Sequence, residues 1–154
     1  EMKRYYLAYG SNLNVRQMKY RCPTAKIVGT AVIRDYELLY KGSKTGSYLT
    51  IEKKKGSLVP VAVWEVTKSD EHSLDIYEGY PNFYYKKNMK IRLSETGKTM
   101  DAFVYIMHEE RRLGIPTSAY VSTCKFGYTI FGFDFKYLDE AYEKSLKGAF
   151  TNEK

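Results

Sequence analysis

The octapeptide YLAYGSNL, residues 6–13, begins in a short aromatic-rich strand predicted over residues 5–9 and ends at the start of a helix. A glycine-hinged turn into a helix N-terminus directs unpaired backbone N–H groups outward, which suits a carboxylate or a developing oxyanion. Ser11 and Asn12 can therefore either cap the helix or bind a ligand. The stretch contains neither GxGxxG nor GxxxxGK, so it does not predict a nucleotide loop.

A second informative stretch is LDIYEGYP, residues 74–81, in which Glu78 precedes the glycine expected to end a helix. A carboxylate there lies at the negative end of the helix dipole. If it also points into a tyrosine-walled pocket, burial and the dipole both raise its pKa, and a raised glutamate is a competent general base near neutral pH. From position alone, a solvated glutamate at a helix end is the favoured interpretation.

Outward from these two stretches, the hydrophobic pattern predicts the remaining elements. Strands are expected at 26–34, 36–40, 48–53, 59–66, 84–93 and 100–107, with a turn at 53–56 and a hairpin turn near Gly97. Helices are expected over 14–21, from a cap at Thr67 or Ser69 to Gly79, from a Ser118 cap to about Gly132, and from about Asp134 to Gly148. Because the strands are grouped rather than alternating with helices, the predicted class is α+β, with about six short strands able to curl into a small barrel.

Length and composition predict one domain, residues 2–150, followed by a short C-terminal tail, residues 151–154. No apolar run approaches the length of a membrane span, so we expect a cytoplasmic protein without a membrane partner. Cys22 and Cys124 are expected to be free, buried thiols, and His72 and His108 to be surface or structural residues. Two histidines cannot form a histidine-rich zinc site, so no metal is predicted.

Sixteen tyrosines and a formal charge of +7 are the unusual features of the composition. Tyrosines can line a pocket while still offering hydrogen bonds. The same features are compatible with a nucleic-acid-binding barrel, on which phosphates meet basic groups and bases stack on rings. The basic residues are, however, scattered among acidic ones, so no nucleic-acid partner is predicted.

The two stretches together resemble the gamma-glutamylcyclotransferase-like (AIG2-like) family. The resemblance lies in YLAYGSNL (6–13) with RCPTA (21–25), and in LDIYEGYP (74–81) leading to Tyr84, with a looser match at Pro116, Tyr120 and Gly127. It runs in order over about residues 5–133. Val61 stands where relatives often carry a glycine.

The resemblance implies a small mixed closed barrel flanked by helices, acting without a cofactor on a small-molecule γ-glutamyl amide. The γ-glutamyl group would be cyclised to 5-oxoproline with release of an amine, Glu78 being the general acid/base. The implied substrate-binding residues are Tyr9, Gly10, Ser11, Asn12, Leu13, Tyr84 and Tyr120. Either Tyr84 or Tyr85 could face the pocket, since a one-residue slip in register reverses a strand's faces.

The leaving amine, the oligomeric state and the choice between carboxylate and oxyanion for residues 10–13 are left open. The alternative function is a catalytically inactive small-molecule or nucleic-acid-binding domain on the same barrel.

Overall fold

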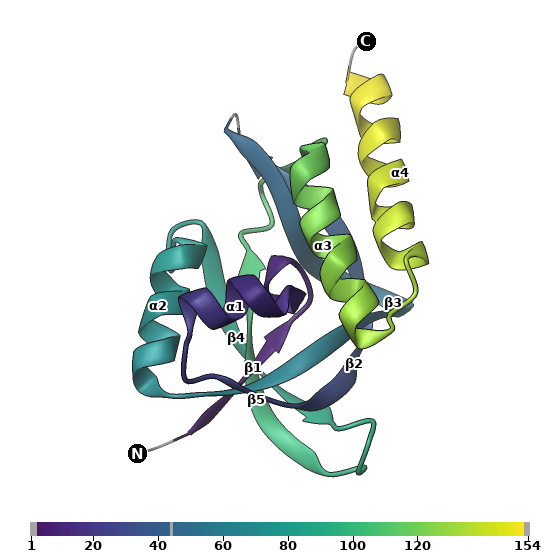
Figure 1. The fold of residues 1–154 in the computed structure, drawn as a ribbon. Helices are drawn as coiled ribbons and strands as arrows, with labels where there is room; N and C mark the ends of the chain where they lie inside the picture. Colours follow the sequence, from purple (N-terminus) through teal and green to yellow (C-terminus); the bar gives the residue numbers. More distant parts are fainter. Residues whose placement is uncertain (1–2, 44, 153–154) are drawn as a thin grey trace.

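A long antiparallel hairpin, β2 (Lys26–Ser43) with β3 (Gly46–Val66), runs through the whole molecule (Figure 1). The computed structural model describes residues 3–43 and 45–152. The other strands are β1 (Arg4–Ala8), β4 (Tyr84–Arg92), β5 (Thr99–Met107) and the two-residue β6 (Arg112–Leu113). Together they form one mixed sheet in the order β4-β5-β1-β3-β2-β6, in which β1 and β5 are parallel and the other pairs antiparallel.

The expected closure of the barrel is wrong for the described residues. The sheet is curled but open, because β4 and β6 lie at its two edges and do not pair with each other. The mixed α+β class is confirmed. β6 was not expected, since two residues in a charged loop carry no alternating pattern that predicts a strand.

The expected turn at 53–56 is also wrong, because β3 continues through it. The predicted runs 26–34 and 36–40 are likewise one strand, interrupted by a register shift between Arg34 and Tyr36. Asp35 adopts a left-handed conformation there, with φ 62°, and its carboxylate accepts a 2.9 Å hydrogen bond from the N–H of Gly56. The polar residues that indicated a turn therefore form a bulge, which bends the hairpin without ending it.

The helices lie on the curled sheet in two groups. Helix α1 (Val15–Arg21) packs beside α2 (Lys68–Glu78), while α3 (Ser118–Phe131) and α4 (Lys136–Asn152) flank the long hairpin (Figure 1). Thr67 caps α2 through a reciprocal capping box with Asp70, and Gly79 ends it in the left-handed conformation, as predicted.

Two predicted helix boundaries are wrong. Thr117, not Ser118, caps α3, because the hydroxyl of Thr117 accepts from the N–H of Tyr120. Helix α4 continues past Gly148 to Asn152, so the first two residues of the expected tail are helical, and the last two lie outside the described residues. No helix in the described ranges has both the length and the apolar character needed to cross a bilayer.

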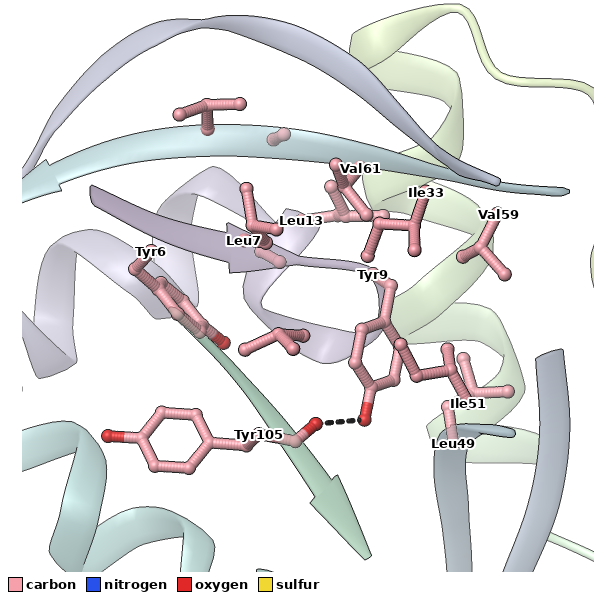
Figure 2. Close-up of a cluster of buried hydrophobic side chains, with 14 of the residues drawn as sticks. Tyr6, Leu7, Tyr9, Leu13, Ile33, Leu49, Ile51, Val59, Val61 and Tyr105 are labelled. Carbon is pink, nitrogen blue, oxygen red and sulfur yellow. Dashed lines mark hydrogen bonds between the residues drawn. The ribbon is translucent and has the colours of Figure 1, made fainter. Parts of the chain in front are cut away.

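The core fills the concave side of the sheet. Figure 2 shows part of it, where side chains of β1, η1 (Ser11–Leu13), β2 and β3 meet. Val61 is fully buried and pairs with Ala31 of β2, so the sheet accommodates this side chain in place of a glycine. Cys22 and Cys124 are buried free thiols and His72 is exposed, as expected.

Candidate functional site

A cavity of about 360 Å³ opens where β1, η1, the end of α2 and the start of α3 meet. Seven tyrosines and Phe83 contribute to its wall, so it is a mainly aromatic space with phenolic hydroxyls. The lining residues are Tyr6, Tyr9, Gly10, Ser11, Asn12, Tyr48, Leu49, Ile76, Tyr77, Glu78, Gly79, Phe83, Tyr84, Tyr105 and Tyr120.

Glu78 supplies the ionisable carboxylate of this wall. It is the last residue of α2, and the left-handed Gly79 (φ 62°) turns the chain away immediately after it. Burial raises the pKa of Glu78 to about 8, against an opposing effect of the nearby Arg21 guanidinium. Among the described residues its carboxylate has no hydrogen-bond partner, so it is available to a ligand in the cavity.

Tyr84 and Tyr120 bind the two backbone polar groups of one residue of β3, Leu49. The hydroxyl of Tyr84 donates a 2.8 Å hydrogen bond to the carbonyl oxygen of Leu49, and the hydroxyl of Tyr120 accepts one of 3.1 Å from the N–H of Leu49. Because Tyr84 donates its only proton to the protein, it shapes the wall, whereas the proton of Tyr120 is not used in that contact.

The choice between Tyr84 and Tyr85 is settled by the register of β4. Tyr84 is buried and lines the cavity. Tyr85 lies on the other face of the strand, where its hydroxyl bonds to Glu109 and its ring packs 5.2 Å from that of His108.

Tyr9 lies at the end of β1 and crosses the core to reach β5. Its hydroxyl donates a 2.7 Å hydrogen bond to the carbonyl oxygen of Tyr105, as Figure 2 shows. Its proton is thus engaged, and burial together with Glu78 raises its pKa. Tyr9 therefore contributes an aromatic face to the cavity and ties β1 to β5.

The predicted residues 10–13 divide into two groups. Gly10, Ser11 and Asn12 line the cavity, and a side chain added at Gly10 would approach the hydroxyl of Tyr120 to 3.4 Å. Leu13, in contrast, is fully buried, does not line the cavity, and its N–H donates to the carbonyl oxygen of Gly10. Leu13 instead packs under α3, where a Cβ on Gly127 would lie 2.5 Å from its own Cβ.

Four further tyrosines of the wall were not singled out from the sequence: Tyr6, Tyr48, Tyr77 and Tyr105. Tyr6 and Tyr77 lie inside the two motifs, but a motif does not say which neighbouring ring faces a pocket. Tyr48 and Tyr105 are on strands, and only the curl of the sheet brings them to the site. Their alternation with other apolar residues carried no signal that distinguishes a pocket from a core.

The sequence profile of the family described as "Gamma-glutamyl cyclotransferase, AIG2-like" matches residues 6–122. The chain is 34% identical to a human gamma-glutamylcyclotransferase over 110 residues, which cover 66% of this chain and 58% of the relative. A cattle gamma-glutamylcyclotransferase is 36% identical over 87 residues, or 52% of this chain and 46% of the relative. The chain thus spans about half the length of these two relatives. A mouse gamma-glutamylcyclotransferase is 29% identical over 156 residues, covering 96% of this chain and 79% of the relative.

Solved structures agree with the sequence matches. A structure described as a gamma-glutamyl cyclotransferase superposes with a TM-score of 0.80 at 27% identity, over 91% of this chain and 86% of the other. A human protein described as uncharacterized gives the same TM-score at 28% identity, over 92% and 87% of the two chains. The chain therefore belongs to the gamma-glutamyl cyclotransferase, AIG2-like family.

Proposed function

We propose that this protein is an enzyme that cyclises the γ-glutamyl group of a γ-glutamyl amide to 5-oxoproline and releases the amine. The observation that carries the proposal is the carboxylate of Glu78 in a tyrosine-lined cavity, with its pKa raised to about 8 by burial. Membership of the family and the names of the curated relatives support the same reaction.

The reaction begins with removal of a proton from the substrate's own α-ammonium group. Glu78 takes this proton, and the free amine attacks the γ-carbonyl carbon to close a five-membered ring. The tetrahedral intermediate then collapses: the bond from the γ-carbon to the leaving nitrogen breaks, and Glu78 returns a proton to that nitrogen. Glu78 carries a second proton from the α-nitrogen to the leaving nitrogen in the same way. The products are a lactam and an alkylammonium ion, and no water is consumed.

The raised pKa suits both halves of this cycle. A carboxylate with an ordinary pKa near 4.5 would be a poor acceptor for an ammonium proton, whereas one near 8 is a stronger base and gives the proton back near neutral pH. Since the nucleophile belongs to the substrate, the protein's main task is to hold a folded, near-attack conformation. The aromatic walls formed by Tyr9, Tyr84 and Tyr120 support that shape and limit water.

The test is release of 5-oxoproline from a panel of γ-glutamyl compounds. The panel contains γ-glutamyl amino acids, γ-glutamyl-ε-lysine, simple γ-glutamyl amines and glutathione, with 5-oxoproline measured by chromatography. Release from at least one compound supports the proposal and identifies the leaving amine. No release from any of them would contradict it and favour a binding domain on the same sheet.

A further inference from the structure

A chain of hydrogen bonds begins at Arg21, at the end of α1, and finishes at a hydroxyl in the cavity wall. The guanidinium of Arg21 donates to Oδ1 of Asn12 and, at 2.8 Å, to Oε1 of Gln17. Its Cζ also lies 3.5 Å from the centre of the Tyr77 ring. Arg21 is thus held on three sides, and its contact with Asn12 is part of a fixed arrangement.

This contact determines the orientation of the Asn12 amide. A guanidinium has only donors, so the group facing it must be the amide oxygen. The amide nitrogen then faces Tyr6, and it donates a 2.9 Å hydrogen bond to the phenolic oxygen. Both residues are almost completely buried, with 2% of Asn12 and 4% of Tyr6 exposed, so the amide cannot exchange partners with water.

The hydroxyl of Tyr6 is therefore an acceptor toward Asn12, and its own proton points elsewhere. Among the described residues no acceptor for that proton is found, although Tyr6 lines the cavity. Burial and the neighbouring Glu78 carboxylate raise the pKa of Tyr6, so the proton is retained throughout the neutral range. A buried donor without an acceptor is costly, which favours an acceptor supplied by the ligand.

We infer that Tyr6 is a further substrate-binding residue, whose hydroxyl donates a hydrogen bond to the carboxylate of the γ-glutamyl unit, and that Arg21 acts as a positioning residue through Asn12. The inference rests on the proposed function. In a γ-glutamyl unit the carboxylate and the α-amine share one carbon, so when the amine faces Glu78 the carboxylate lies in the same part of the cavity, whose wall includes Tyr6. No cationic side chain lines the cavity among the described residues, so neutral donors must supply this recognition.

The product 5-oxoproline retains the carboxylate, so its binding tests the inference without turnover. Dissociation constants for 5-oxoproline and its carboxamide are measured by calorimetry at pH 6, where Glu78 (pKa about 8) stays protonated. Tyr6→Phe is expected to weaken 5-oxoproline binding about 10-fold or more, as for a hydrogen bond to a charged group, and to leave carboxamide binding nearly unchanged. Arg21→Gln allows the Asn12 amide to turn over, so this variant is expected to lose part of the preference for 5-oxoproline over its carboxamide. Arg21→Lys is expected to keep that preference, because lysine, like arginine, has only donors.

Tyr128→Phe is the matched control, because this hydroxyl is also buried and, among the described residues, has no acceptor for its proton, but it lies outside the cavity lining; binding is expected to stay unchanged. If the wild type releases 5-oxoproline while Tyr6→Phe binds it as tightly as the wild type, the inference is overturned and the proposed function stands. If Tyr6→Phe lowers kcat and leaves 5-oxoproline binding intact, the assignment to the carboxylate is equally overturned. A wild type that neither releases nor binds 5-oxoproline would contradict the proposed function itself.

Discussion

The hydroxyl of Tyr105 donates a 2.6 Å hydrogen bond to Oδ1 of Asp75, which joins β5 to α2 one turn before Glu78. The same carboxylate oxygen lies 2.9 Å from Nζ of Lys86, on β4. The end of the helix that carries Glu78 is therefore attached to two strands of the sheet. This attachment fixes the proposed base relative to the tyrosine wall.

Asp75→Ala is expected to destabilise the protein by about 1–3 kcal/mol, because it leaves the Tyr105 hydroxyl without its acceptor and removes one of the two carboxylates that pair with Lys86 among the described residues. Urea unfolding measures the change. Asp101→Ala is the control, since the side chain of Asp101 is 80% exposed in its ion pair with Lys90, and a change within about 0.5 kcal/mol is expected. Equal effects of the two substitutions would show that the Asp75 contacts add nothing to stability.

Gly127→Ala is expected to displace the loop that begins at Gly10. The added Cβ would lie 2.5 Å from Cβ of Leu13 and 2.6 Å from its carbonyl carbon, and backbone cannot move aside as a flexible side chain can. We expect a loss of about 1–3 kcal/mol of stability, together with weaker substrate binding. Gly148→Ala in α4 is the comparison: its Cβ meets only the Leu113 side chain, at 3.2 Å, and the substitution should be close to neutral. A neutral Gly127→Ala would mean that α3 does not position the loop.

Glu78→Gln is expected to stabilise the protein in a pH-dependent way. The pKa of Glu78 is about 8 in the folded state and near 4.5 in the unfolded chain, so between these values the unfolded state loses its proton first. The wild type therefore loses stability as pH rises through this window, and the neutral Gln does not. The variant should match the wild type below pH 4.5 and gain at least about 1 kcal/mol by pH 8. A pH-independent difference in urea unfolding would show that the carboxylate is not destabilised by burial.

Residues of both motifs line the cavity, and each motif contains a backbone feature that local sequence determines. Gly79 ends α2 at Glu78, and Gly10 precedes η1, irrespective of the rest of the fold. Tyr48 and Tyr105 could not be predicted, since their place in the wall depends on how far the sheet curls. The location of Leu13 outside the cavity lining was hidden for a related reason: its position in the motif does not reveal that α3 packs directly on it through Gly127.

The long hairpin illustrates the same limit in the fold. Asp35 and Gly56 have turn-forming chemistry, and the sequence alone does not distinguish a bulge within a strand from a turn between two strands. The structure shows a bulge, because β2 pairs with β3 on both sides of it. The sheet is open because its edge strands, β4 and β6, do not pair among the described residues, and no local sequence pattern predicts whether two edge strands will pair.

The central claim is that Glu78 is the base, and the most direct test is the pH dependence of 5-oxoproline release by the wild type and by Glu78→Gln. For the wild type, kcat/KM is expected to rise with pH along a limb governed by an apparent pKa near 8, where Glu78 loses its proton. In Glu78→Gln, which keeps the shape but cannot accept a proton, kcat should fall at least ~10²-fold. Turnover in Glu78→Gln close to that of the wild type, with the same rising limb, would contradict the account.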